Sequence, residues 1–160
     1  MTEQLLIMRH GQAGNGSPDA SRTLTARGRD EGLCMATWLA GRDDLDLSRL
    51  RLLASPYRRA QQTAELIAEA LEAELETLPI ITPDDSPVAA VDWLLELDGG
   101  EPLLLVSHMP LVAALTGLLV EGRSDRGPGF PTAAIAELEA DVFANGCARI
   151  IRFTSPADLA

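Results

Sequence analysis

The chain has 160 residues, 46% of them hydrophobic, and this length suits one domain, residues 1–160, with a single core. Its formal net charge at pH 7 is −11. A surface with this much negative charge repels nucleic acid and anionic membranes, and we expect neither as a partner. The apolar run near the N-terminus, residues 5–8, is too short for a signal peptide or a membrane span.

Short apolar runs alternate along the chain with amphipathic segments of helix length. This alternation predicts an α/β fold: a three-layer sandwich with a mostly parallel central sheet and helices on both faces. Residues 5–8 are continuously apolar and predict a central strand that is covered on both faces. In chain order we expect a strand at 4–9, a helix at 26–40, strands at 51–54 and 77–79, a helix at 88–97, a strand at 103–106, a helix at 110–120 and strands at 134–139 and 148–153, the last two joined as a hairpin.

A further helix is expected after the strand at 51–54. Ser55 and Pro56 there have the pattern of an N-cap residue followed by proline in the first helical position. For the helix at 88–97, the spacing predicts a buried stripe formed by Val88, Val91 and Leu95.

The two cysteines, Cys34 and Cys147, lie in apolar-periodic segments and do not form a CxxC pair. Such cysteines are typical of buried free thiols in a reducing compartment. We therefore expect free, buried thiols and a cytoplasmic location.

The only two histidines each follow an apolar run, with one residue between the run and the histidine. His10 comes after residues 5–8, and His108 comes after residues 103–106. If both runs are parallel strands, both imidazoles lie at the carboxyl edge of the sheet, where open α/β sheets hold ligands. The alternative is that they are two unrelated polar residues at strand ends.

A third segment reaches the same predicted edge. Ser55 closes the strand at 51–54, and Arg58 and Arg59 fall in the first turn of the next helix. Cations oppose the dipole at a helix N-terminus, so an arginine that binds an anion would offset an unfavourable position. Helix N–H groups, arginines and neutral imidazoles together make a site for a phosphoryl group.

Three segments carry a family resemblance. Arg9-His10-Gly11 resembles the RHG signature of the histidine phosphatase (phosphoglycerate-mutase-like) superfamily, residues 55–64 resemble its S-x-x-x-R-A-x-Q-T segment, and residues 107–110 resemble the segment of its second histidine. The chain is most similar to the short, SixA-type phosphohistidine phosphatases, over nearly its whole length. The resemblance implies a phosphoglycerate-mutase-like fold.

It also implies site residues. His10 would be the nucleophile, Arg9 and Arg59 would clamp the phosphoryl group, and His108 would be a further phosphate ligand. Arg22 is a less direct counterpart, as an additional anion contact. In the loop after His10, Gly11 and Asn15 are candidate substrate-binding residues. No metal and no cofactor is expected, because arginines and imidazoles can stabilise a phosphoryl group by themselves.

The chain departs from larger members of the superfamily at the general acid. Ile80 stands where they carry an acidic residue that protonates the leaving oxygen. Asp84 or Asp85 could supply the acid, or both could form a solvated turn. An imidazole leaving group has a conjugate-acid pKa of about 6.5 and can be protonated by water, so a missing acid favours phosphohistidine over phosphate esters.

The sequence thus predicts a phosphohistidine phosphatase that works through a covalent phospho-His10 intermediate. Fewer than fifty residues separate Arg59 from His108, which leaves little chain for a lid and favours a protein substrate, such as a phosphotransfer domain or phosphocarrier. We expect a monomer. Two alternatives stay open: a broad-specificity phosphomonoesterase that uses Asp84 or Asp85, and a non-catalytic phosphate-binding module.

Overall fold

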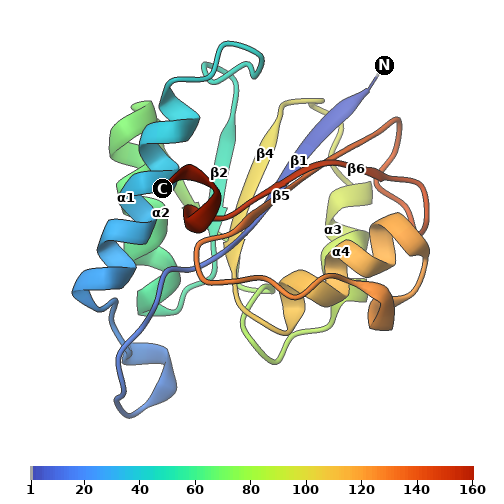
Figure 1. The fold of residues 1–160 in the computed structure, drawn as a ribbon. Helices are drawn as coiled ribbons and strands as arrows, with labels where there is room; N and C mark the ends of the chain where they lie inside the picture. The colour runs from blue at the N-terminus through green and yellow to red at the C-terminus, as the bar shows by residue number, and fades with distance from the viewer. Residues whose placement is uncertain (1) are drawn as a thin grey trace.

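In the computed structural model, which describes residues 2–160, six strands form one sheet in the order β3-β2-β4-β1-β5-β6 (Figure 1). The strands are β1 (Glu3–Arg9), β2 (Arg51–Ala54), β3 (Leu75–Thr77), β4 (Leu103–Ser107), β5 (Ile135–Ala140) and β6 (Arg149–Thr154). The first four are parallel, whereas β5 runs antiparallel to β1 and β6 antiparallel to β5. The predicted α/β fold with a mostly parallel sheet is confirmed.

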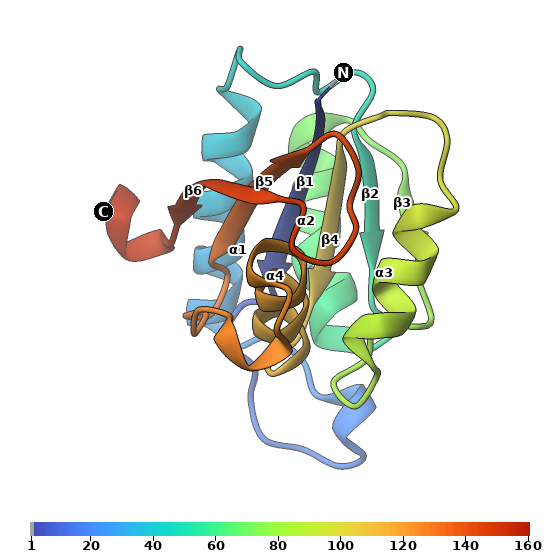
Figure 2. The same cartoon turned by 90° about the vertical axis from the view of Figure 1, so that its right-hand side faces the viewer.

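Helices cover both faces of this sheet. Figures 1 and 2 show α1 (Ala26–Ala40) and α2 (Arg58–Leu71) on one side and α3 (Pro87–Leu95) and α4 (Leu111–Glu121) on the other. Side chains alternate along β1, so Leu6 and Met8 enter the core under α1 and α2, while Leu5 and Ile7 enter the core under α3 and α4. Double coverage explains why this strand is continuously apolar.

Three local predictions are wrong. Helix α2 begins at Arg58, after an extended Tyr57, so Ser55 is not its N-cap. The strand expected at 77–79 lies at Leu75–Thr77.

The third wrong prediction is the buried stripe of α3. Ala90, Val91 and Leu94 form the buried face of this helix, whereas Val88 and Leu95 are exposed. A helix this short fits more than one apolar stripe, and packing against α4 decides between them.

The C-terminal strands pair antiparallel, as expected, with residues 141–148 as their connection. Gly146 in this connection has a φ of 71°, which glycine adopts without strain. Both cysteines are free, but the predicted burial is wrong: Cys34 is half-buried, and Cys147 lies exposed in this connection. None of the helices in residues 2–160 combines the length and the apolar character needed to cross a membrane.

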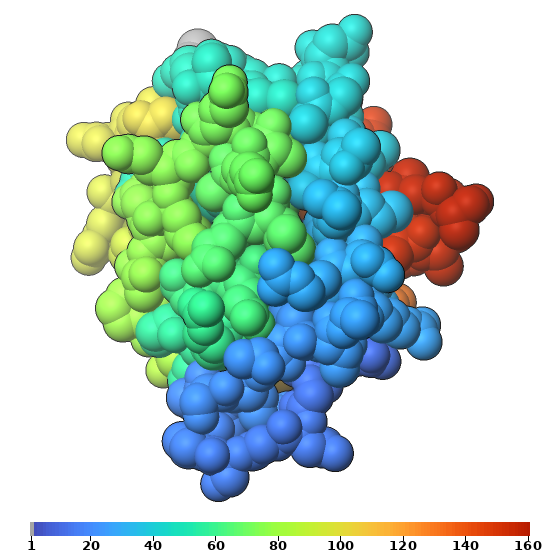
Figure 3. Space-filling model, turned by 90° about the vertical axis from the view of Figure 1, so that its left-hand side faces the viewer, coloured from blue at the N-terminus to red at the C-terminus, as the bar shows by residue number. Residues whose placement is uncertain are grey.

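The carboxyl ends of β1, β2 and β4 meet at one edge of the sheet. Arg9 is paired with Ser107, so His10 and His108 emerge at the same level. Ala54 is paired with Val106, so Ser55 emerges one residue earlier, beside Ser107. The segment that follows β1, which contains the short helix η1 (Asp19–Ser21), projects beyond this edge. In Figure 3 it forms the blue projection at the lower end of the molecule.

Candidate active site

The His10 imidazole lies at the carboxyl end of β1 and is 7% exposed. Its Nδ1 is 2.6 Å from the carbonyl oxygen of Gly11, so Nδ1–H donates there and Nε2 keeps its lone pair. Burial above all, with a contribution from the nearby arginines, lowers the pKa of His10 to about 4. His10 is therefore neutral near pH 7 and presents a nucleophilic nitrogen.

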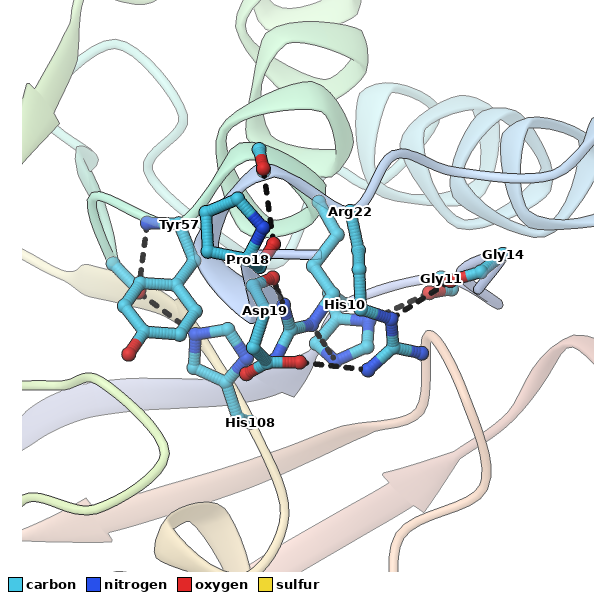
Figure 4. Close-up of polar contacts among 11 residues, drawn as sticks. His10, Gly11, Gly14, Pro18, Asp19, Arg22, Tyr57 and His108 are labelled. Atoms are coloured by element: carbon cyan, nitrogen blue, oxygen red, sulfur yellow. Dashed lines mark hydrogen bonds and ion pairs between the residues drawn. The ribbon is translucent and has the colours of Figure 1, made fainter. Parts of the chain in front are cut away.

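The second histidine, His108, packs edge-on against His10 with ring centroids 5.0 Å apart (Figure 4). Its Nε2 is 2.7 Å from the Ser55 hydroxyl. That hydroxyl also accepts a hydrogen bond from the Tyr57 N–H, and within residues 2–160 its own proton has one acceptor, His108 Nε2, to which we assign it. The ring proton of His108 then resides on Nδ1, which is buried and has no hydrogen-bond partner within residues 2–160.

Burial above all, followed by the proximity of His10, lowers the pKa of His108 to about 3. The ring is therefore neutral. Its unpaired Nδ1–H is a donor for a ligand, on the side of the ring that faces His10 and Asp19 in Figure 4.

The two arginines at the start of α2 have different environments. Arg59 is buried, and its Nε donates to His10 Nε2 at 3.3 Å. Arg58 is half exposed and lies 3.5 Å from Glu65 on the same helix. Only Arg59 faces the histidines, in agreement with the position that the motif assigns to it.

Arg22 and Arg9 add positive charge to the same space. The Arg22 Nε donates to the carbonyl oxygen of Gly14 at 2.7 Å, and its Nη1 donates to Asp19 at 2.9 Å. Arg9 donates through Nη1 to the carbonyl oxygen of Phe130 at 2.7 Å, while its buried Nε has no partner within residues 2–160. Three arginines around two neutral imidazoles make this edge of an acidic protein a site for an anion.

The loop that carries His10 is fixed from two helices. The Gly11 N–H donates to the Thr63 hydroxyl on α2 at 3.0 Å, and the Gln12 N–H donates to Glu31 on α1 at 2.8 Å. Gly28 on α1 packs so closely that a Cβ there would lie 2.0 Å from the carbonyl oxygen of Gln12. The nucleophile is thus held by packed backbone.

Of the remaining candidates, Asp84, Asp85 and Asn15 form no hydrogen bond with the two histidines or the three arginines within residues 2–160. Asp85 accepts hydrogen bonds from the N–H and hydroxyl of Thr82, so it caps a turn. Asp84 and Asn15 are exposed. Gly11 contributes through its backbone, by orienting His10 and by tying the loop to α2.

Asp19 and Tyr57 lie at the site but were not among the predicted site residues, and Ser55 was predicted to be a helix N-cap. Asp19 precedes Arg22 by three residues, a spacing that signals a local ion pair, but nothing local predicts its contact with Arg59. Ser55 ends a strand just as the histidines do, and this was the available signal for a site role. The Tyr57 ring packs edge-on against His108, with centroids 5.2 Å apart.

Fold and site together define an α/β protein with an anion site around a buried neutral histidine, and comparisons identify its family. The model of the histidine phosphatase superfamily (branch 1) matches residues 5–82. Phosphohistidine phosphatase SixA of Escherichia coli (strain K12) is 38% identical over 148 residues, which cover 89% of each chain. The phosphohistidine phosphatase SixA homolog of Haemophilus influenzae is 34% identical, over 84% of this chain and 86% of the relative.

A solved structure agrees with these relatives. The protein histidine phosphatase SixA complexed with tungstate superposes with a TM-score of 0.86 at 35% identity, over 98% of this chain and 99% of the other. The chain belongs to the histidine phosphatase superfamily. Within that superfamily it is a homologue of phosphohistidine phosphatase SixA.

Proposed function

We propose that this protein is a phosphohistidine phosphatase, in which His10 takes the phosphoryl group from a phosphohistidine of another protein and passes it to water. The observation that carries the proposal is the neutral, oriented Nε2 of His10, surrounded by the donors of Arg59 and of His108 Nδ1. The SixA relatives bear the same activity in their names. A solved structure of the protein histidine phosphatase SixA contains tungstate, a tetrahedral oxyanion with the shape of phosphate.

In the first step, the His10 Nε2 lone pair attacks phosphorus, and the N–P bond of the substrate breaks. Negative charge on the transferring oxygens is stabilised by Arg59, by His108 Nδ1–H and by the nearby Arg9 and Arg22. His10 becomes an N-phosphoimidazolium, and its Nδ1–H stays bonded to the Gly11 carbonyl oxygen. In the second step, water attacks phosphorus, the new N–P bond breaks, and phosphate and neutral His10 are regenerated.

The leaving group supports phosphohistidine as the substrate. An alkoxide must receive a proton from a positioned acid, whereas an imidazole can take its proton from water beforehand. Asp85 is engaged as a turn cap, and Asp84 is exposed. Such an arrangement suits a leaving nitrogen better than a leaving oxygen.

The substrate is proposed to be a phosphotransfer or phosphocarrier protein, which presents its histidine at the open edge of the sheet. We further propose that the enzyme is a cytoplasmic monomer of one domain. Its two free thiols support a reducing compartment.

The test is phosphate release from a phosphohistidine-bearing carrier domain and from simple phosphate esters, with wild type and His10→Ala side by side. We expect the carrier to be dephosphorylated much faster than the esters and the variant to be inactive on both. Arg58→Ala, at the exposed arginine of α2, is the matched control and should keep wild-type activity. If the esters are hydrolysed faster than the carrier, the enzyme is a phosphomonoesterase and the proposed substrate class is wrong. If wild type and His10→Ala release phosphate at the same rate, His10 is not the catalytic nucleophile.

A further inference from the structure

Asp19 lies across the anion site. One carboxylate oxygen, Oδ1, accepts a hydrogen bond from Arg22 at 2.9 Å, and the other, Oδ2, accepts one from Arg59 at 3.1 Å. The Asp19 carbonyl oxygen also accepts from Arg59, at 2.7 Å. Figure 4 shows this side chain reaching towards Arg22 beside His10 and His108.

A substrate phosphoryl group and Oδ2 of Asp19 compete for Arg59. The Arg59 Nε points at His10 Nε2, so a phosphoryl group placed for attack must take hydrogen bonds from the same guanidinium. Two anions cannot share those donors without repulsion. When Arg59 turns to the phosphoryl group, Oδ2 of Asp19 loses its partner, while Oδ1 remains bonded to Arg22.

The freed oxygen lies on the solvent side of the site. The Asp19 side chain is 55% exposed, whereas that of Arg59 is 5% exposed and that of His10 is buried. A leaving group departs opposite the attacking nitrogen, and the open side of the site is the side of Asp19. Its carboxylate is ionised, because the hydrogen bond from Arg22 above all lowers the pKa of Asp19.

We propose that Asp19 is a specificity-determining residue for the leaving group: Oδ2 exchanges Arg59 for the ring N–H of the substrate phosphohistidine. A carboxylate is a hydrogen-bond acceptor, so it stabilises a protonated imidazole ring and offers nothing to an ester oxygen. This inference rests on the proposed function and names the group that selects nitrogen over oxygen.

The N–P bond of the substrate can break without a general acid, because the leaving imidazole ring is protonated beforehand. The free ring nitrogen of the phosphohistidine first takes a proton from water, and the resulting N–H donates to Asp19. His10 Nε2 then forms its bond to phosphorus, and the electron pair of the breaking N–P bond returns to the other ring nitrogen. The substrate imidazole leaves neutral, with the acquired proton still on the nitrogen that faces Asp19.

The test compares two small substrates with leaving groups of similar acidity, phosphoimidazole, which has a ring nitrogen to protonate, and p-nitrophenyl phosphate, which has none. We expect Asp19→Asn to lower kcat/KM for phosphoimidazole at least about tenfold, the effect of losing a hydrogen bond to a charged group. For p-nitrophenyl phosphate, kcat/KM should stay within about threefold of wild type. Asp19→Glu keeps a carboxylate and should recover a large part of the loss. Asp125→Asn removes another exposed carboxylate, which is paired with Arg123 away from the site, and should change neither rate.

Parallel losses on both substrates would overturn the proposal, because Asp19 would then only hold the arginines in place. Unchanged or raised rates on phosphoimidazole would overturn it as well, since the carboxylate would then be only a competitor of the phosphoryl group. Failure of the proposed function gives a different result: wild type itself would hydrolyse p-nitrophenyl phosphate but neither phosphoimidazole nor a phosphorylated carrier.

Discussion

The two buried histidines make the fold sensitive to mild acid, and the size of the effect follows from their pKa values. In the folded protein the pKa is about 4 for His10 and about 3 for His108. In the unfolded chain both should titrate near the ordinary value of about 6.5. As the pH falls from 7 to 5, both histidines of the unfolded chain become protonated while those of the folded state stay neutral, and the folded state loses stability.

Each histidine contributes a loss of about 2 kcal/mol in the free energy of unfolding between pH 7 and pH 5, so the pair contributes about 4 kcal/mol. These two are the only histidines in the sequence. The low carboxyl pKa values, such as that of Asp44 at about 2, act at lower pH.

The assay is urea denaturation followed by circular dichroism at both pH values, for wild type, His10→Asn, His108→Asn and the double variant. Each single substitution should remove about half of the acid-dependent loss, and the double variant should remove nearly all of it. A wild type equally stable at pH 7 and pH 5, or a double variant that keeps the full loss, would refute the reasoning that both imidazoles are neutral in the fold.

Three further substitutions test the site and its support. Ser55→Ala should lower kcat/KM at least about tenfold, because His108 loses the partner that fixes its tautomer; the 15N chemical shifts of the ring should change with it, and unchanged shifts would contradict the assignment. Arg59→Lys should lower kcat/KM about 100-fold, since a point charge replaces a fork of donors, whereas Arg58→Lys should stay within about threefold in the same assay; equal effects would be contrary to the geometry. Gly28→Ala should lower the free energy of unfolding by about 2 kcal/mol or more in urea titrations, because its Cβ would lie 2.0 Å from the carbonyl oxygen of Gln12. An unchanged urea midpoint would show that the loop after His10 moves to make room for the Cβ.

Most of the fold could be predicted because its strongest signals are local. The uninterrupted apolar runs of β1 and β4 require cover on both faces, and that requirement alone implies helices on either side of a parallel sheet. The same runs place His10 and His108 at one edge, since both residues follow parallel strands in register.

The errors arose where tertiary contacts override local preference. Ser55 followed by Pro56 has the local pattern of a helix start, yet the hydroxyl bonds to His108, which is 53 residues away. Asp19 lies in a polar loop that predicts nothing beyond a turn, and its meeting with Arg59 depends on how that loop folds over the end of α2. Contacts between distant segments of this kind have no signature in a single sequence.

Direct detection of a phosphoryl group on His10 tests the proposed function most directly. Wild type mixed with a phosphohistidine-bearing carrier is quenched in alkali on the millisecond scale, and its peptides are then mapped by mass spectrometry. We predict a phosphoryl group on His10 that appears before free phosphate accumulates and that is absent from His10→Ala. Phosphate released at full rate with no phosphorylated His10 at any quench time, or with the phosphoryl group on His108, would contradict the proposed mechanism.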